Sequence, residues 1–240
     1  MRPAPLAESG ISLVAVLLAT GFFSTVALGL ALLVSTSLRA DSNYTSAVTM
    51  LNGAEAALEL AAHDLALEVD WNLVLSGVTQ SAFTDGAPSG AKAVPIGGIV
   101  NLSAQTNLLN CGMASACTAA QMDAASLDRP WGPNNPRWQP YLFGPLPALG
   151  ALMHGVPLYA IVWVGDDGSE GDGNPLQDGS TLSDPGRGVV QLRAEIFGAA
   201  GARSAVQALV RRVCWTENIG ERCLPGVRVQ SWRDVRQWLP

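Results

Sequence analysis

The stretch from residue 11 to residue 38 reads ISLVAVLLATGFFSTVALGLALLVSTSL and contains no charged residue. As an α-helix, these 28 residues would rise about 42 Å, more than the ~30 Å hydrocarbon layer of a membrane. The leader before it, MRPAPLAESG, carries one Arg and one Glu. A secretory signal peptide would start with more basic residues and would have an apolar run of about 7–15 residues. The stretch therefore predicts a transmembrane helix that remains on the mature protein.

The helix is expected to continue past the apolar stretch, because no Pro interrupts the chain between Leu6 and Ala87. From residue 41 to residue 69 apolar residues recur with four-three spacing, which predicts an amphipathic helix with one packing face. The predicted stripe consists of Ala47, Leu51, Ala54, Leu58, Ala61 and Leu65. We therefore expect one helix from residue 11 to about residue 69.

Strand patterns are concentrated in the second half of the chain. Residues 158–164, LYAIVWV, form a continuous apolar run, and residues 188–197 and 204–213 flank a Gly-containing turn as a β-hairpin. With residues 141–146 as a further candidate, these runs predict an antiparallel sheet of three or four strands that packs on the helix stripe. The expected fold class is α+β, with a long irregular insertion of short helices and strands over residues 76–151.

A segment rich in Trp and Pro lies within that insertion, at residues 129–140. Its two Trp rings are expected to cover a small core beneath an extended loop. The alternative is an exposed stacking surface for a sugar or for an Arg of a partner.

The leader and the residues after it resemble the class III signal of type IV pilins and pseudopilins. A short leader ends in Gly10, and Ile11, Ser12, Leu13 and Val14 open the apolar helix. The resemblance implies that prepilin peptidase cleaves between Gly10 and Ile11 and methylates the new N-terminus. Residues 54–58 (AEAAL), 70–72 (DWN) and the Trp-Pro segment are similar to PilX-type minor pilins, which are pilus assembly proteins.

The fifth residue after the expected cleavage site departs from the main family, which has Glu where this chain has Ala15. A carboxylate buried in a fibre needs a partner such as the N-terminal amine of a neighbour, and Ala15 cannot make that pair. By resemblance, subunits that lack this Glu include PilX-type proteins and the K-type minor pseudopilins of type II secretion. The major structural pilin is therefore not expected.

The resemblance implies a division into a leader (1–10), a transmembrane half (11–38) and a periplasmic half (39–70) of the helix, and a globular pilin-like domain (71–240). It implies a single-pass protein of the bacterial inner membrane, with a periplasmic C-terminal domain that can enter a surface pilus. The expected partners are prepilin peptidase, the inner membrane and other pilin or minor pilin subunits, which would pack on residues 11–38.

The expected function is a minor pilin or assembly subunit that primes or joins a type IV pilus-like fibre. One alternative is a K-like minor pseudopilin of type II secretion. Another is a membrane-anchored periplasmic domain that binds a ligand and never polymerises. The net charge of −6 argues against a generally basic nucleic-acid binder. Because the common catalytic motifs are absent, no enzymatic activity is expected.

The four cysteines form two close pairs in sequence, Cys111 with Cys117 and Cys214 with Cys223. Neither pair has the spacer that is usual for a zinc site, and the two histidines are isolated. We therefore expect disulfides in an oxidising compartment. Four cysteines allow three pairings, and local pairing would close two short loops.

Residues 165–188, GDDGSEGDGNPLQDGSTLSDPGRG, contain six carboxylates and seven glycines. Carboxylate oxygens on a flexible loop suit calcium, but the spacing does not match an EF-hand. A solvated connection with Asp and Gly in turns is the favoured interpretation, and no cofactor is expected. The alternative is a calcium site, whose candidate ligands are Asp166, Asp167, Glu170 and Asp172.

Overall fold

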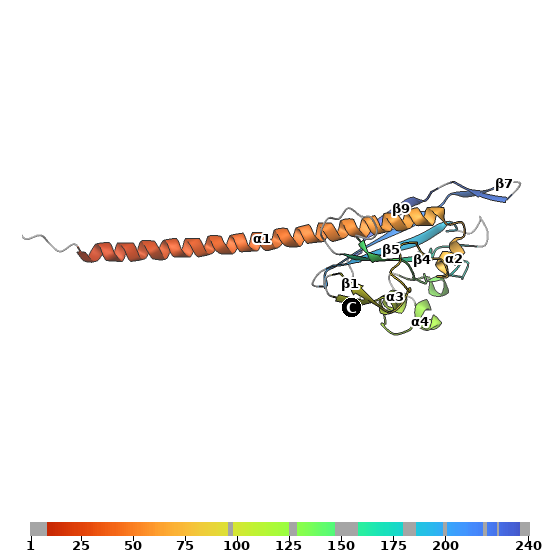
Figure 1. Ribbon diagram of the computed structural model, residues 1–240, viewed down its shortest axis with the longest axis horizontal. Coiled ribbons are helices and arrows are strands. Elements are labelled where there is room, and N and C mark those ends of the chain that lie inside the picture. The colour runs from red at the N-terminus through yellow and green to blue at the C-terminus, as the bar shows by residue number, and fades with distance from the viewer. Residues whose placement is uncertain are drawn as a thin grey trace, which may run out of the picture. The chain divides into compact units, whose positions relative to one another are not determined.

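The computed structural model describes residues 9–95, 98–124, 129–146, 158–179, 186–198, 201–217, 220–224 and 226–235. The chain divides into two compact units, Met1–Val48 and Thr49–Pro240. Helix α1 (Ser9–Leu67) contributes to both units (Figure 1). The predicted helix is therefore confirmed, with an end two residues before the expected Val69.

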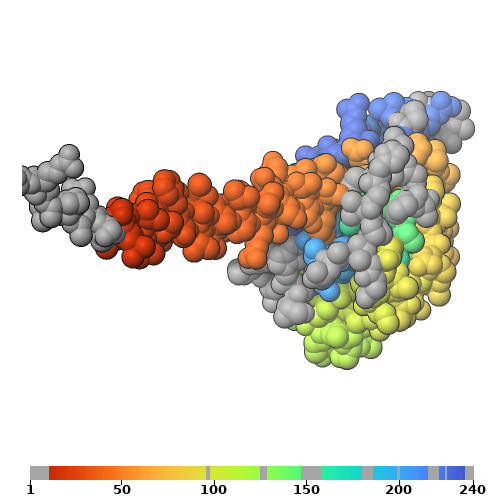
Figure 2. Space-filling model, turned by 60° about the vertical axis from the view of Figure 1, so that its left-hand side comes forward, coloured from red at the N-terminus to blue at the C-terminus, as the bar shows by residue number. Residues whose placement is uncertain are grey.

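The first unit consists of the N-terminal part of α1. Every side chain from residue 11 to residue 48 is exposed, and this surface is the red and orange rod of Figure 2. A helix whose apolar side chains are covered by none of the described residues gains no stability from a core. Its apolar surface is therefore available to a membrane or to other chains.

The second unit is built around a five-stranded antiparallel sheet. The strand order is β3-β4-β5-β6-β9, so consecutive strands pair and only β9 is reached after a detour through a hairpin. The strands are β3 (Gln139–Pro145), β4 (Tyr159–Asp166), β5 (Val189–Phe197), β6 (Arg203–Arg211) and β9 (Arg228–Asp234). The four predicted strands are confirmed, and β9 is a fifth that the sequence patterns did not indicate.

One face of the sheet packs against the C-terminal part of α1, residues 49–67. Leu58, Ala61 and Leu65 are at most 2% exposed and contact the inward-facing side chains of β4, β5 and β6. Two members of the predicted stripe are placed differently, since Ala47 is exposed and Leu51 is only half-buried. Met50 takes the first core position instead, because the second unit begins at Thr49 and every residue from 11 to 48, Ala47 included, is exposed.

The opposite face of the sheet carries a second apolar cluster. It is covered by the segment between α2 (Trp71–Leu75) and β3, which Figure 1 shows on the side of the sheet away from α1. This segment contains β1 (Ala91–Val94), β2 (Gly98–Asn101), α3 (Leu102–Cys111), α4 (Ala119–Asp123) and the 3-10 turn η1 (Gly132–Asn134). The expected insertion of short helices and strands is therefore present, and it forms a third layer.

Strand β4 shows why a continuous apolar run predicts a central strand. All eight of its residues are buried, and the six from Tyr159 to Val164 alternate between the two clusters. Ala160, Val162 and Val164 face α1, while Tyr159, Ile161 and Trp163 belong to the cluster under the insertion. A strand covered on both faces has no polar side, so its sequence does not alternate.

Two short elements complete the second unit. Trp71 begins α2, is 1% exposed, and donates a hydrogen bond from its indole N–H to the carbonyl of Leu65 at the end of α1 (3.0 Å). A hairpin of β7 (Cys214–Glu217) and β8 (Gly220–Cys223) follows β6. The fold is α+β, with a long apolar N-terminal helix on an antiparallel sheet, and this architecture is consistent with a pilin-like fold.

The helix–sheet contact makes a prediction about two neighbouring leucines. Leu65→Ala removes a side chain that is 1% exposed and should lower the free energy of unfolding by about 2–5 kcal/mol. Leu67→Ala changes a side chain that is 72% exposed and should alter it by less than about 0.5 kcal/mol. Chemical denaturation of the detergent-solubilised chain measures both. Equal losses for the two variants would contradict the assigned packing face.

Candidate functional site

The first candidate site is the apolar surface of α1 between residues 11 and 38. Its large side chains range from 42% to 78% exposed, for example Leu18 at 69% and Phe23 at 69%. Among the described residues, α1 is the one helix long and apolar enough to cross a membrane. Contiguous apolar surface of this extent marks a site of contact with lipid or with another protein.

Hydroxyl side chains within this apolar surface bond to the helix itself. Thr20 donates to the carbonyl of Leu17 (3.0 Å), and Thr25 donates to that of Phe22 (2.8 Å). Ser35, Thr36 and Ser37 likewise donate to carbonyls three or four residues earlier. A hydroxyl that donates to a carbonyl of its own helix keeps this hydrogen bond in hydrocarbon, where no water is present. The surface is therefore suited to a dry environment.

The expected processing residues lie at the beginning of α1. Gly10 follows the first helical residue, Ser9, and Ile11 is 78% exposed. Ala15 is exposed in the same part of the helix, and residues 11–38 contain no carboxylate at all. The cleavage between Gly10 and Ile11 remains a prediction.

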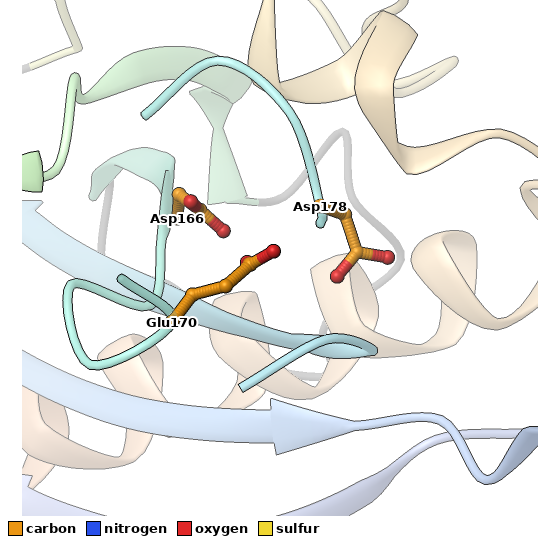
Figure 3. Close-up of side chains that lie close together, drawn as sticks. All are labelled: Asp166, Glu170 and Asp178. Atoms are coloured by element: carbon orange, nitrogen blue, oxygen red, sulfur yellow. The ribbon is translucent and has the colours of Figure 1, made fainter. Parts of the chain in front are cut away.

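The second candidate site is a group of three buried carboxylates, Asp166, Glu170 and Asp178 (Figure 3). Asp166 ends β4, Glu170 lies in the turn after it, and Asp178 lies farther along the connection to β5. Their exposed fractions are 0%, 3% and 3%. One oxygen from each lies within 4.8 Å of the other two. The connection was expected to be solvated, so the burial of these side chains corrects that interpretation.

Asp166 is the carboxylate whose burial is least offset by hydrogen bonds or by positive charge. Both of its carboxylate oxygens are buried, and neither accepts a hydrogen bond of normal geometry from the described residues. Burial, and next the neighbouring carboxylate of Glu170, raise the pKa of Asp166 to about 9. The nearby backbone N–H of Asp167 offsets part of this shift, whereas Asp178 and Asp172 add to it. The anionic form of Asp166 is therefore strongly disfavoured by its own protein surroundings.

Glycine residues shape the space around Glu170. A Cβ on Gly179 would lie 2.0 Å from Oε1 of Glu170, and a Cβ on Gly186 would lie 3.1 Å from its Cα. Both glycines have positive φ, +58° and +92°, which other residues rarely adopt. Gly179 and Gly186 can therefore approach Glu170 this closely only because they lack a Cβ.

Asp178 is held by hydrogen bonds from three parts of the second unit. Its Oδ1 accepts from the backbone N–H of Gly188 (2.5 Å), and its Oδ2 accepts from Nη2 of Arg212 (3.0 Å). Its own backbone N–H donates to Oδ1 of Asn72 in α2 (2.7 Å). Burial raises the pKa of Asp178, while the Gly188 N–H, Arg212 and Arg187 favour its ionised form. Asp178 thus connects the three buried carboxylates to α2 and to the end of β6.

Two of the four calcium candidates predicted from the sequence lie outside this group. Asp167 instead accepts hydrogen bonds from the backbone N–H and hydroxyl of Ser169 (3.3 and 2.7 Å). Asp172 is exposed and accepts from the backbone N–H of Asn174 (2.7 Å). Asp178 was missed because it is eight residues from Glu170. Its one signal in the sequence was the Gly that follows it, a turn residue that could return the chain to the group.

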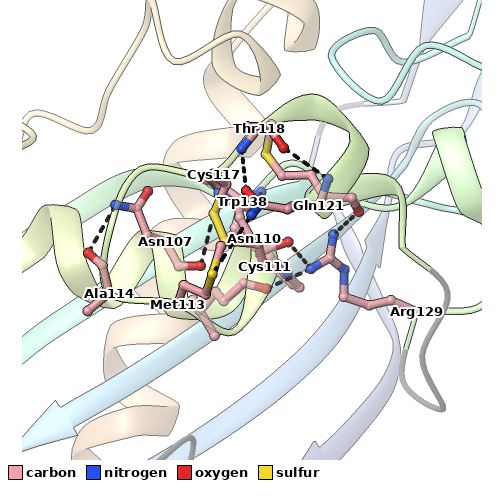
Figure 4. Close-up of a disulfide and its surroundings, with 12 residues drawn as sticks. Asn107, Asn110, Cys111, Met113, Ala114, Cys117, Thr118, Gln121, Arg129 and Trp138 are labelled. Carbon is pink, nitrogen blue, oxygen red and sulfur yellow. Dashed lines mark hydrogen bonds between the residues drawn. A yellow bond between two sulfur atoms is a disulfide. The ribbon is translucent and has the colours of Figure 1, made fainter.

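Both local cysteine pairs form disulfides, Cys111–Cys117 and Cys214–Cys223. The second lies directly across the β7–β8 hairpin. The first closes a loop at the end of α3, where Gly112 adopts φ +75° as the helix cap (Figure 4). The metal alternative for these cysteines is therefore wrong. Disulfides and a membrane-capable helix together suggest a single-pass protein with an extracytoplasmic domain.

Polar contacts hold the first disulfide loop against the rest of the insertion (Figure 4). The Arg129 guanidinium donates to the carbonyls of Leu109 (3.0 Å) and Met122 (2.7 Å). The amide of buried Asn110 donates to the carbonyl of Trp138 (3.0 Å), and its Oδ1 accepts from the backbone N–H of the same residue (2.8 Å). These contacts are structural, because each partner is a backbone group of the insertion.

The two Trp rings of the Trp-Pro segment have different surroundings. Trp138 is 5% exposed and belongs to the cluster under the insertion, as the covering role predicts. Trp131 is 40% exposed, and its ring lies over Gly168, where an added Cβ would come within 2.8 Å of it. Trp131 thus covers the turn between Asp166 and Glu170.

A scan against protein-family models, a search of curated proteins and a search of solved structures each found no match to this chain. Its functional interpretation therefore depends on the residues and geometry described above.

The contacts of Arg212 make a prediction about stability. Its guanidinium pairs with Asp178, donates to the carbonyl of Val69 (3.0 Å) and lies 4.4 Å from the Trp71 ring centre. Arg212→Ala leaves the Asp178 carboxylate buried without its cation and should lower the free energy of unfolding by about 2–4 kcal/mol. Arg211→Ala, at an exposed neighbouring position, should cost less than about 0.5 kcal/mol in the same denaturation experiment. A loss below about 1 kcal/mol for Arg212→Ala would show that the pair contributes little.

Proposed function

We propose that this chain is a minor pilin or pilus assembly subunit that primes or joins a type IV pilus-like fibre through α1. One observation carries the proposal. A single helix has an N-terminal part whose side chains are all exposed and largely apolar, and a C-terminal part that forms the core of an α+β unit. The C-terminal part of the helix thus packs on the sheet of its own chain. The N-terminal part needs an apolar environment from a membrane or from other chains.

The proposed mechanism is helix packing between subunits. Before assembly, residues 11–38 would lie in the inner membrane. Their apolar side chains are tolerated there, and so are the hydroxyls that donate to carbonyls of their own helix. In the fibre, the same residues would be buried in a shared bundle of helices. A Cβ added at Gly21 or Gly29 would have no atom within 4 Å, so both positions leave backbone surface open to a close neighbour.

The globular unit would select neighbours in the periplasm. Strand β9 is at one edge of the sheet, and all seven of its residues are exposed. Arg228 and Arg233 outnumber the one acid of this strand, Asp234, so the edge carries a net positive charge that favours an acidic surface on the neighbour. We assign no enzymatic activity to the chain.

Ala15 supports a low-copy role. A repeated subunit of a fibre buries its fifth mature residue many times, and the usual Glu can pair there with the N-terminal amine of a neighbour. Because Ala15 cannot make this pair, the chain is better suited to initiation or to the tip, where the pairing is not repeated. The K-type minor pseudopilins of type II secretion share this feature. Co-purification with a secretion platform instead of pilus components would favour that alternative.

The proposal predicts where the mature chain begins. In membranes from cells with prepilin peptidase, mass spectrometry should find an N-terminus at Ile11, and cells without the peptidase should retain the leader. Gly10→Val should block cleavage, because the resemblance places a Gly on the leader side of the cut. Gly21→Val makes the same change eleven residues later and should leave cleavage intact.

Two results would contradict the pilin-like assignment. One is an intact Met1 in cells that contain the peptidase, and the other is an N-terminus downstream of Leu38. The second result would mean that the apolar stretch is removed as a secretion signal, so that no helix could enter a fibre bundle.

A further inference from the structure

The rest of the chain offsets the burial of the three carboxyl groups unevenly. Two arginines, Arg212 and Arg187, act on Asp178. The side chains that act on Asp166 are Glu170, Asp178 and Asp172, all of them acidic. A buried carboxylate without a well-formed hydrogen bond or a counter-charge is costly. Asp166 has neither among the described residues, although it is fully buried.

The side chains are also oriented towards one another. In Figure 3 the carboxylates of Asp166 and Glu170 extend from opposite sides into the same space, and Asp178 lies beside them. The turn that carries Glu170 begins directly after β4, so Asp166 and Glu170 are both placed by the end of a fully buried strand. Such placement is the opposite of a solvated acidic loop, whose side chains point outward.

We propose that Asp166, Glu170 and Asp178 bind a calcium ion at the end of the sheet. Carboxylate oxygens are hard ligands, and calcium accepts six to eight oxygens at about 2.3–2.6 Å. Two oxygens on opposite sides of such an ion are therefore about 4.6–5.2 Å apart. The three carboxylates lie within 4.8 Å of one another and can reach one ion together.

The chemistry of the group separates calcium from other common cations. Zinc sites are usually built with Cys or His, and every side chain in this group is a carboxylate. Magnesium normally keeps several of its waters, which side chains that are at most 3% exposed cannot easily accommodate. Calcium accepts a protein-built shell of irregular geometry and is the best match.

A bound calcium ion would connect distant parts of the second unit. Asp166 is the last residue of β4, while Asp178 contacts Asn72 in α2, Gly188 before β5, and Arg212 after β6. The ion would therefore hold the connection between β4 and β5 against the sheet and α2. This inference goes beyond the assembly function and does not depend on it, since all three ligands lie in the globular unit.

The rival explanation is a pair of acids that share a proton, with no metal involved. Both explanations relieve the repulsion between Asp166 and Glu170. They differ in one observable, because only the first gives saturable binding of calcium.

The test is a calcium titration of the full chain, purified in detergent and depleted of metal with a chelator. Isothermal titration calorimetry should show one ion per chain with a dissociation constant of about 1 mM or tighter, the range of extracellular calcium modules. Magnesium chloride should bind at least tenfold more weakly. The melting temperature should rise with calcium until the site is saturated. Terbium should also emit when Trp is excited, because Trp131 covers the turn between two of the ligands.

Variants locate the site. Asp166→Asn should weaken calcium binding at least tenfold while the metal-free chain stays folded, since the amide has the same shape without the charge. Glu170→Gln should do the same and serves as the second variant if Asp166→Asn fails to fold. Asp172→Asn is the matched control, because Asp172 is an exposed acid of the same connection that acts on Asp166 only through its charge, and it should change the calcium dissociation constant by less than about threefold.

Three outcomes would overturn the proposal. They are absence of saturable calcium binding by the unmodified chain, equal affinity for magnesium, and unchanged binding in both Asp166→Asn and Glu170→Gln. The titration can be carried out on the chain with its leader in place. A failed calcium test would therefore leave the processing test unaffected, and a failed processing test would leave calcium binding to be decided.

Discussion

The globular unit depends on the contact between one face of α1 and one face of the five-stranded sheet. Leu58 and Leu65 are at most 2% exposed there, and the small residues between them let the helix lie close to the strands. The same contact places α2, because the Trp71 indole bonds to the last turn of α1. It thereby places Asn72, which holds the backbone of Asp178. The position of the carboxylate group thus follows from the packing of the helix.

Much of the fold could be predicted because its signals are local. An uninterrupted run without Pro predicted α1, and the continuous apolar run LYAIVWV predicted the strand β4. Strand β9 could not be recognised, because its seven residues are all exposed and no burial selects an apolar pattern. The start of the packing face was also missed, because Ala47 lies before the second unit and Met50 is the first buried residue of the helix.

The carboxylate group shows where sequence reasoning stops. Spacing along the chain suggested Asp166, Asp167, Glu170 and Asp172, but it does not tell which side chains turn inward. Asp167 and Asp172 bond to backbone groups within two residues of themselves, so they stabilise turns. Asp178 enters the group eight residues after Glu170, next to Gly179, whose missing Cβ leaves room for the Glu170 side chain. A composition rich in turn residues does not tell which acidic side chains are buried. It also does not tell which of them meet after the chain has turned back.

We propose that residues 11–38 pack on helices of other subunits, and photo-cross-linking in living cells would detect this packing. A photoreactive amino acid at Leu18, which is 69% exposed, would capture whatever lies against this surface. We predict an adduct that mass spectrometry identifies as another subunit with a Gly-ending leader and a long apolar helix. This adduct should be lost when fibre assembly is abolished. Adducts with lipid alone, at Leu18 and at every other position tested between 11 and 38, would contradict the claim.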